Sequence, residues 1–324
     1  MLDNFLQILP EVIFDAAETL GGRCTGRFYA LNAMENRVYD IDMEEGPHVV
    51  IKFYRPGRWS RATIQAEHDF LKALEGSEIP VVCPLTDDKG QSIFEINQVM
   101  FTIFPKRPGR LEPELNTEQL TRLGRFMARL HNVGAAVKGA PRLRLDPHTY
   151  GREPLKFLKD GNFVPIQLAS RYETIATAIC DAITPGFADL EYILLHGDCH
   201  SGNILWNRDA PYFVDFDDML YAPAVQDIWM LTGGDDDYGK ERRQILLEAY
   251  AEFRTFDMTT MRLIEPLRAL RMIHFSAWVA RRWEDGAFKM AFPAFGTERY
   301  WEEQIEGLAL QLEKVQNHTR ELYY

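Results

Sequence analysis

The sequence predicts an α+β protein with a small antiparallel sheet in its first third and a larger, mainly helical remainder. Alternating β-branched and aromatic segments cluster before residue 105, and apolar residues at helical spacing dominate after it. Between the two parts, residues 104–109 contain two prolines and a glycine, a composition typical of a connection between lobes. We therefore predict a smaller N-terminal lobe at residues 1–104 and a larger C-terminal lobe at residues 105–324.

The first third is predicted to contain a helix, a three-stranded meander, a second helix and a hairpin. The helices are expected around residues 3–20 and residues 60–74, and the second carries Glu67 among its apolar positions. The turn-prone residues 32–36 separate the first two strands. The expected strands are RFYAL, RVYDID and HVVIKFY, followed by a hairpin of QSIFEI and NQVMFTIF.

The remainder is predicted to be helical around one small inserted sheet. Asn116 is a good N-cap with Gln119 three residues on, and an apolar stripe at helical spacing follows. Residues 192–218 instead have the pattern of strand, loop, strand, turn and strand. Further helices are expected at about residues 167–183, 224–233, 240–256, 259–284 and 297–317.

Composition and charge exclude several classes of protein. Of the 324 residues, 46% are hydrophobic and 26% charged, which disfavours a disordered or membrane-spanning chain. The 36 Lys and Arg against 48 Asp and Glu give a net charge of −12, which argues against nucleic acid and anionic membranes as partners. Four widely separated cysteines, with no CxxC pair and no secretory signal, predict reduced thiols in the cytoplasm. A monomer is the default expectation.

The stretches HGDCHSGN at residues 196–203 and FVDFDD at residues 213–218 contain the residues suited to chemistry. Asn203 follows Asp198 by five positions, and Asp215 follows Asn203 by twelve. Taken singly, these residues are ordinary turn formers. As a spaced triplet they have the relation used in phosphoryl transfer by kinases, where one Asp accepts the proton of the substrate hydroxyl. The Asn and the second Asp hold magnesium against the nucleotide phosphates, and hard oxygen ligands suit that ion.

These stretches resemble the HGDxHxxNxL and (V/I)DFDD signatures of the aminoglycoside phosphotransferase family. The resemblance spans about residues 31–283, and so both predicted lobes. It implies a bilobal, protein-kinase-like fold and an ATP- and Mg2+-dependent phosphotransferase, more narrowly a bacterial serine/threonine protein kinase of the stress response. The hydroxyl-bearing acceptor is then expected to be protein Ser/Thr. The other blocks of this resemblance are LNAMENRVYDI, VVIKFYRPGRW, PAVQDIWML and IEPLRALRMI.

The resemblance implies roles for the residues of the triplet. Asp198 and Asp215 would be the catalytic residues, with Asp198 as the proton acceptor. Asn203 and Asp215 would be the magnesium ligands. Asp227, in PAVQDIWML, would brace the catalytic loop through its backbone and so have a structural role.

The resemblance implies that Lys52 and Glu67 serve nucleotide binding. Lys52 would contact the nucleotide phosphates, and Glu67 would form an ion pair with Lys52. Independently, alternation places Ile51 and Phe53 on one face of the strand HVVIKFY and Lys52 on the other. If that face points into a cleft, a bare ammonium would be costly without an acid or a phosphate beside it. Glu67 is a plausible acid. The alternative is a lysine that extends to water and a solvated helix glutamate.

The first turn departs from the protein-kinase pattern. No GxGxxG lies between the first strands, and residues 32–36 occupy the place of the glycine-rich turn. Backbone amides and Asn side chains there can cover phosphates, and we assign Ala33 to nucleotide binding on the strength of the resemblance.

Two other functions stay open from the sequence, and a third has no support. The wider family also phosphorylates aminoglycosides, choline, homoserine and sugars, and the sequence separates such small acceptors from proteins poorly. A metal-dependent hydrolase with a two-metal site would leave Lys52, Glu67 and Asn203 without roles. A catalytically silent nucleotide-binding module has no support, because all five expected residue types are present. The hydrolase would use His196, Asp198, His200, Asp215, Asp217 and Asp218.

Overall fold

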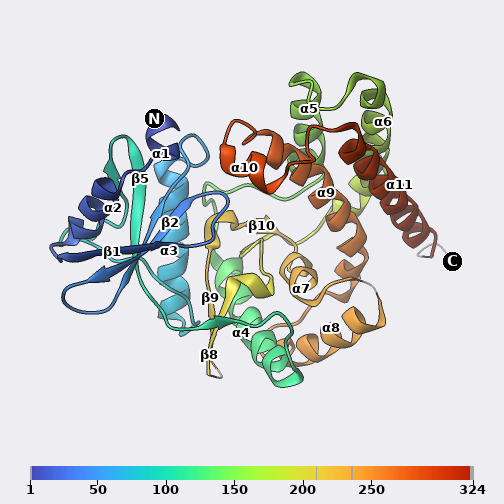
Figure 1. The fold of residues 1–324 in the computed structure, drawn as a ribbon. Helices are drawn as coiled ribbons and strands as arrows, with labels where there is room; N and C mark the ends of the chain where they lie inside the picture. The colour runs from blue at the N-terminus through green and yellow to red at the C-terminus, as the bar shows by residue number, and fades with distance from the viewer. Residues whose placement is uncertain (1, 209, 235, 322–324) are drawn as a thin grey trace. The chain divides into compact units, whose positions relative to one another are not determined.

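The structure, a computed structural model, describes residues 2–208, 210–234 and 236–321 (Figure 1). The chain divides into two units. The first contains the chain up to Arg142 together with Asp198–Met219 and Gln244–Arg254. The second contains Leu143–Gly197, Leu220–Arg243 and the chain from Thr255 onward. The two lobes predicted from the sequence are a different division of the chain and stay a prediction.

A five-stranded antiparallel sheet organises the first unit. Its strand order is β1-β2-β3-β5-β4, so the three-stranded meander and the hairpin are confirmed. Lys52 on β3 pairs with Val38 on β2 and with Thr102 on β5, which places it at the centre of the sheet. The strands are β1 (Cys24–Ala30), β2 (Arg37–Met43), β3 (Val49–Phe53), β4 (Phe94–Ile96) and β5 (Val99–Pro105).

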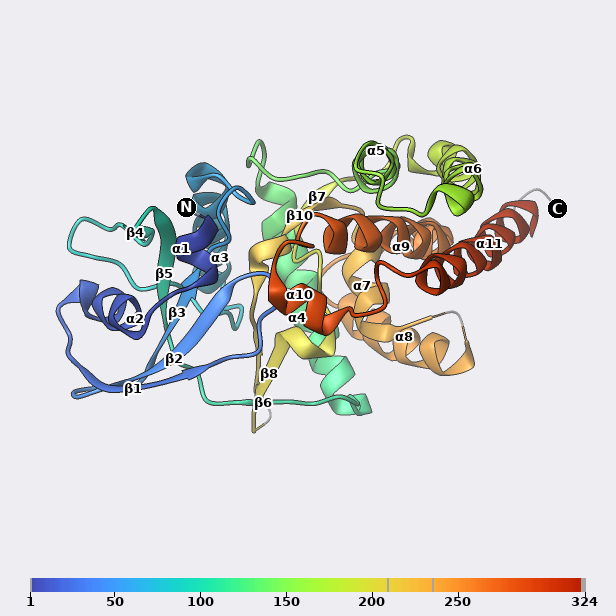
Figure 2. The same ribbon diagram turned by 45° about the horizontal axis from the view of Figure 1, so that its top comes forward.

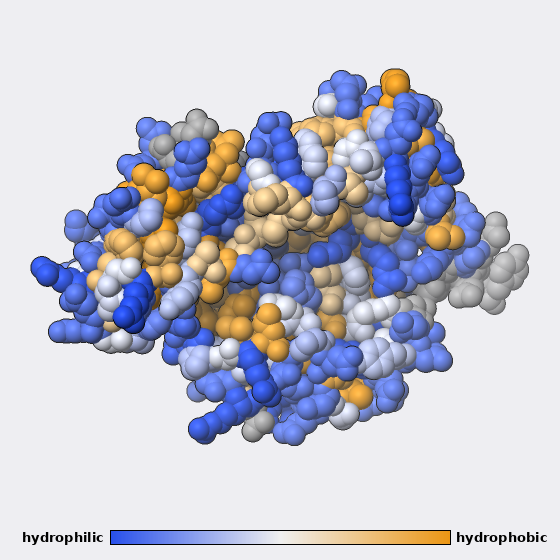
Figure 3. Space-filling view, viewed as in Figure 1, coloured by the Kyte–Doolittle hydropathy of each residue, from blue (hydrophilic) through white to orange (hydrophobic). Residues whose placement is uncertain are grey.

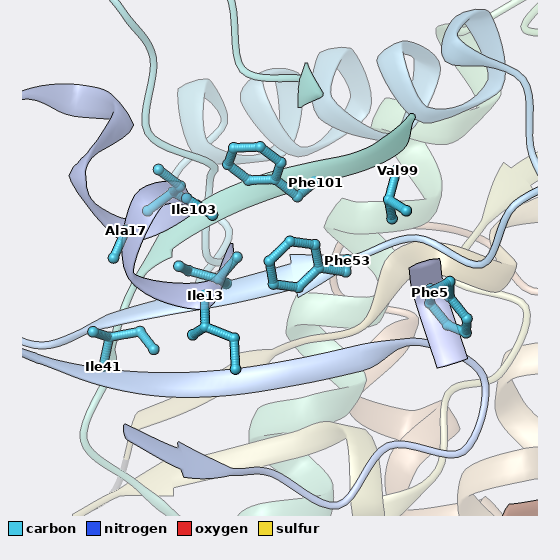
Figure 4. Close-up of a cluster of buried hydrophobic side chains, with 10 residues drawn as sticks. Phe5, Ile13, Ala17, Ile41, Phe53, Val99, Phe101 and Ile103 are labelled. Atoms are coloured by element: carbon cyan, nitrogen blue, oxygen red, sulfur yellow. The ribbon is translucent and has the colours of Figure 1, made fainter. Parts of the chain in front are cut away.

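One face of this sheet is apolar and packs against the N-terminal helices α1 (Leu2–Leu6) and α2 (Pro10–Ala17). Ile51 and Phe53 lie in this buried cluster, as the alternation of β3 predicts (Figure 4). The prediction of one helix over residues 3–20 is wrong, because α1 ends at Leu6 and α2 begins at Pro10. Pro10 lacks an amide hydrogen, so it is tolerated in the first turn of a helix but not in the interior. A new helix, α2, therefore begins at Pro10.

The other face of the sheet carries Lys52 and Tyr54, and helix α3 (Arg61–Gly76) packs there. Ser60 caps α3 by accepting a hydrogen bond from the amide of Thr63 at 3.1 Å. Tyr54 packs with Ile64 of α3 in a small apolar cluster. The helix therefore presents its buried side, which includes Glu67, toward the face of the sheet that holds the lysine.

The same unit contains helix α4 (Thr117–Ala136) and a three-stranded sheet of order β6-β8-β9. The predicted capping box is confirmed, because Asn116 and Gln119 each bond the backbone amide of the other. The strands are β6 (Arg110–Leu111), β8 (Ile204–Asn207) and β9 (Ala210–Phe213).

The second unit is mainly helical. Its helices α5, α6, α9 and α11 pack on one another (Figures 1 and 2). The predicted single inserted sheet is found as two, because β7 pairs with β10 and not with β8. The elements are β7 (Ile193–Leu195), β10 (Leu220–Ala222), α5 (Glu153–Asp160), α6 (Ile166–Ile183), α7 (Val225–Thr232), α9 (Ile264–Ala280), α10 (Gly286–Ala291) and α11 (Glu298–Glu321); α8 (Asp237–Tyr250) contributes residues to both units.

The surface is mixed in polarity. On the face shown in Figure 3, hydrophilic side chains predominate, and apolar ones gather over the part of the first unit that holds α1 and α2. Leu2 and Leu9 there are exposed. Across the residues that the structure describes, none of the helices has the length and apolar character needed to cross a membrane.

Gly124 in α4 supports a first testable prediction. A Cβ at this position would lie 2.2 Å from the carbonyl oxygen of Leu246, so Gly124→Ala forces α4 away from α8. We expect it to lower the free energy of unfolding by about 1–3 kcal/mol, although Gly to Ala in an open helix usually adds about 1 kcal/mol. Gly76→Ala in α3 is the control, since nothing lies within 4 Å of its added Cβ. Urea unfolding checks both; a Gly124→Ala protein at least as stable as wild type contradicts the packing.

Candidate active site

The loop before β8 brings Asp198 and Asn203 together. The Asn203 side-chain amide donates to the carbonyl oxygen of Asp198 at 3.0 Å, and the Asn203 backbone amide donates to the carbonyl oxygen of His200 at 2.9 Å. Asp198 is largely buried, with 24% of its side chain exposed, and its carboxylate lies 3.4 Å from Nε2 of His200. The loop is therefore held by its own polar groups, and the Asp198 carboxylate has a defined position.

The pairing of β8 with β9 places Asn203 beside Asp215. Ile204 pairs with Phe213, and the backbone amide of Val214 donates to the carbonyl oxygen of Asn203 at 3.0 Å. Asp215 follows directly and has 56% of its side chain exposed. Two members of the triplet, twelve positions apart in sequence, thus sit at the same end of one strand pair.

Asp227 braces the backbone at His196 and Gly197, directly before Asp198, within the second unit. Its two carboxylate oxygens accept from the backbone amides of His196 at 3.1 Å and Gly197 at 2.9 Å. The side chain of Gln226 donates to the carbonyl oxygen of Gly197 at 2.9 Å. The structural role predicted for Asp227 is confirmed by these contacts.

The ammonium of Lys52 lies among three carboxylates. Its Nζ is 3.0 Å from Asp215 Oδ1, 3.3 Å from Asp217 Oδ1 and 3.8 Å from Glu67 Oε1. Lys52 has 8% of its side chain exposed and Glu67 has 2%. The structure thus brings together the lysine, the helix glutamate and the second aspartate that the sequence singled out.

Asp217 is the most heavily paired acid of the cluster. It accepts a hydrogen bond from the Asn36 side chain at 3.1 Å and forms an ion pair with Arg58, in addition to its contact with Lys52. Arg58 also pairs with Asp218. The guanidinium of Arg142 donates to the backbone carbonyl oxygen of Asp217 at 2.8 Å.

Burial and charge move the pKa values of the cluster in opposite directions. Burial raises the pKa of Glu67 to about 7, against the opposing attraction of Lys52. Burial also opposes the charges of Lys52 and Asp217. The opposite charges beside each group outweigh the effect of burial. The neighbouring carboxylates raise the pKa of Lys52 well above its usual value, and Lys52 and Arg58 lower the pKa of Asp217. At neutral pH Lys52 and Asp217 are therefore charged, and Glu67 is the group closest to titration.

Asp218 is affected electrostatically both by Asp198 and by this cluster. Partial loss of hydration raises its pKa, and Arg58 opposes that shift. The negative charges of Asp217, Asp198 and Asp215 add to the rise, so the carboxylates of both motifs act on one side chain.

Several residues of the cluster were not predicted. The sequence singled out neither Arg58 nor Arg142, and it gave Asn36 only as one of the Asn side chains that can cover phosphates. It left Asp217 and Asp218 open between an enlarged acidic site, a cap of the following segment and the hydrolase alternative. Arg58 lies in the block VVIKFYRPGRW, which was used only as a mark of resemblance. Ala33 is partly buried in the turn between β1 and β2, and its contact with a nucleotide stays a prediction.

The donor atoms fit a divalent metal that is partly held by phosphate. Asp215 offers a half-exposed carboxylate, and Asn203 uses its amide nitrogen on Asp198, which leaves the amide oxygen for a metal. Among the described residues, His, Cys, Asp and Glu form no group of three or more that could hold a metal by itself. Magnesium bound by one or two protein oxygens, water and nucleotide phosphates does not need such a group. Because Asp217 and Asp218 are paired with Arg58, the two-metal hydrolase loses two of its ligands.

Residues 30–264 match the model of the phosphotransferase enzyme family, and this segment contains the Lys52 cluster and both motifs. The chain belongs to that family. The family resemblance predicted from the sequence is thereby confirmed.

Two bacterial proteins are similar to this chain over nearly its whole length. The chain is 37% identical to stress response kinase A of Escherichia coli (strain K12) over 320 residues, which is 98% of this chain and 97% of that protein. It is 38% identical to serine/threonine protein kinase RdoA of Salmonella typhimurium over 311 residues, 94% of this chain and 93% of that protein.

Solved structures confirm the protein-kinase-like fold of this phosphotransferase. Amicoumacin kinase hAmiN, in complex with AMP-PNP, Ca2+ and Ami, has a TM-score of 0.71 at 20% identity and covers 92% of this chain and 93% of its own. The microcompartment-associated aminopropanol kinase has a TM-score of 0.69 at 16% identity. The match covers 96% of this chain and 98% of the kinase chain. At such identities the likeness concerns the fold.

The raised pKa of Glu67 predicts how stability depends on pH. Between about pH 4.5 and 7 the unfolded chain releases this proton while the folded chain retains it, so the group's contribution to stability falls as pH rises. Glu67→Gln removes that loss. We compare the free energy of unfolding of the variant with that of wild type at each pH. This difference should shift in favour of the variant by up to about 3 kcal/mol from about pH 5 to about pH 8. Urea unfolding at both pH values measures this, with the exposed Glu95→Gln as control. A constant difference across pH contradicts the assignment.

Proposed function

We propose that this phosphotransferase is an ATP- and Mg2+-dependent serine/threonine protein kinase. The observation that supports this most strongly is the 3.0 Å contact between Lys52 and Asp215, which are 163 positions apart. A buried ammonium beside a half-exposed carboxylate is what a metal-bound triphosphate requires: one positive group for phosphate and one oxygen ligand for the ion. The sequence-derived division into lobes at residues 1–104 and 105–324 belongs to the same proposal.

In the proposed reaction Asp198 accepts the proton of the acceptor hydroxyl while that oxygen attacks the γ-phosphorus. The bond from the γ-phosphorus to the bridging oxygen breaks, and ADP leaves. Lys52 holds the phosphates, and Glu67 keeps Lys52 in place. Asn203 and Asp215 would hold the metal, which would neutralise charge on the phosphates. Positioning and electrostatic stabilisation thus supply most of the rate enhancement.

The residues 32–36 between β1 and β2 are proposed to cover the phosphates, with Ala33 in contact with the nucleotide. This turn is fixed to the site by Asn36, whose side chain donates to Asp217. The turn lacks the glycine-rich sequence that covers the phosphates in protein kinases.

A protein acceptor is favoured over a small molecule by the relatives. The bacterial proteins at 37–38% identity carry the names stress response kinase A and serine/threonine protein kinase RdoA, and the alignments span nearly the whole chain. Amicoumacin kinase hAmiN and the microcompartment-associated aminopropanol kinase, whose names give small-molecule acceptors, are only 20% and 16% identical. We also propose that the protein acts as a monomer in the cytoplasm, a reducing compartment suited to its four free cysteines.

Replacing the two aspartates should separate chemistry from binding. We expect Asp198→Ala to lower phosphate transfer by about 100-fold or more while ATP affinity changes by less than about threefold. Asp215→Ala should weaken binding of Mg-ATP itself by about tenfold or more. Single-turnover kinetics and calorimetry measure the two effects, with the exposed Asp69→Ala as control. Equal transfer by wild type and Asp198→Ala refutes the assigned base.

Labelled ATP identifies the acceptor. Purified protein is incubated with γ-labelled ATP and Mg2+, with and without a cell extract, and Asp198→Ala serves as the inactive control. We expect label on protein, recovered as phosphoserine or phosphothreonine. Label confined to small molecules would overturn the protein acceptor, and label no greater than that of the control would overturn phosphoryl transfer.

A further inference from the structure

Arg58 contacts three acidic residues from two distant parts of the chain. It lies in the connection between β3 and α3, with 8% of its side chain exposed. Its guanidinium pairs with both Asp217 and Asp218, and its Nε is 3.7 Å from Oε1 of Glu35. The guanidinium also lies 5.0 Å from the ring centre of Trp59. A planar group held on a ring and by several carboxylates has little freedom to move.

The segment that Arg58 holds begins with a strained residue. Asp215 has φ 60° and ψ 62°, the left-handed conformation that is unfavourable for a residue with a Cβ. A short 3-10 helix, Phe216–Asp218, follows at once. Such a conformation persists only where its surroundings hold it. The orientation of the Asp215 carboxylate therefore depends on what anchors the next three residues.

Several contacts anchor those residues, among them those of Asn36 and Lys52 to the carboxylate of Asp217. Phe216 packs edge-on against Phe70 of α3 with ring centres 6.0 Å apart, and Arg142 bonds the backbone carbonyl oxygen of Asp217. Arg58 pairs with the carboxylates of both Asp217 and Asp218. Lys52 also forms an ion pair with Asp217, but it is assigned to the nucleotide phosphates, whereas Arg58 is not. Arg58 can therefore be replaced without removing that assigned group or an apolar core side chain.

The same anchor reaches the turn between β1 and β2. Asn36 donates to Asp217 and accepts from the backbone amide of Arg55 at 3.2 Å. Glu35 lies beside the guanidinium of Arg58. Arg58 and Asp217 thus join residues 32–36 to the Asp215 turn.

We propose that Arg58 is a positioning residue for the metal–nucleotide site: it holds the Asp215 turn in the conformation in which Asp215 binds the metal. This inference rests on the proposed function. The sign of the effect separates positioning from simple charge. A cation near a metal site repels the metal, so if charge dominated, removing Arg58 would strengthen metal binding. If positioning dominates, removal weakens it.

The experiment measures binding of a non-hydrolysable ATP analogue by calorimetry, once with Mg2+ and once with EDTA. We expect Arg58→Gln to weaken binding with Mg2+ by about tenfold or more, as the loss of a group supporting a metal ligand usually does. Binding in EDTA should change by less than about twofold. Arg58→Lys, which keeps the charge but not the two-pronged geometry, should fall between. Arg125→Gln is the control, because Arg125 forms an equally two-pronged pair with Glu252 outside the site, at 2.8 and 2.9 Å.

Each result decides the proposal. Unchanged or tighter Mg2+-dependent binding by Arg58→Gln overturns it, and so does an equal loss with Mg2+ and with EDTA, which indicates general damage. Thermal unfolding without ligand checks that each variant folds. If Arg58→Gln does not fold, Arg58→Lys decides by the same criterion. Wild-type protein that binds no metal–nucleotide overturns the proposed function itself, whereas wild-type binding with normal binding by Arg58→Gln overturns this inference alone.

Discussion

The buried ammonium of Lys52 is the interaction on which the rest of the site depends. It lies on the central strand of a five-stranded sheet, within 4 Å of acids from α3 and from the turn after β9. A lysine so buried is stable only when opposite charges replace its lost hydration. Because Asp215 and Asp217 are supplied by a segment more than 160 positions away, the chain must bring that segment to the sheet for the lysine to be satisfied.

The arginines then determine how the acids share the available positive charge. Asp217 contacts both Lys52 and Arg58, so it remains ionised and serves a structural role. Asp215 contacts Lys52 but stays half-exposed, so its carboxylate remains accessible to a metal. Glu67 is the most buried of the three, with 2% of its side chain exposed, and burial raises its pKa. Three carboxylates of similar chemistry thus acquire different roles from their surroundings.

Local patterns account for what the sequence predicted, and long-range contacts account for what it missed. Alternation along β3 placed Lys52 opposite Ile51 and Phe53, and the Asn116 capping box marked the start of α4. No periodicity in the sequence predicts the pairing of β7 with β10. Nor does any predict the contacts that Asp217 makes with Arg58, 159 positions away, and with Asn36, 181 positions away. The short helices α5 and α10 were also missed, because so few turns leave little apolar periodicity.

Diffraction from crystals grown with Mn2+ and a non-hydrolysable ATP analogue tests the central claim most directly, since Mn2+ replaces Mg2+ and scatters anomalously. The account predicts an anomalous peak bound to oxygens of Asp215 and Asn203, with the Lys52 ammonium on a nucleotide phosphate. A peak on Asp217 and Asp218 with Arg58 displaced, or a nucleotide bound away from Lys52, would contradict it.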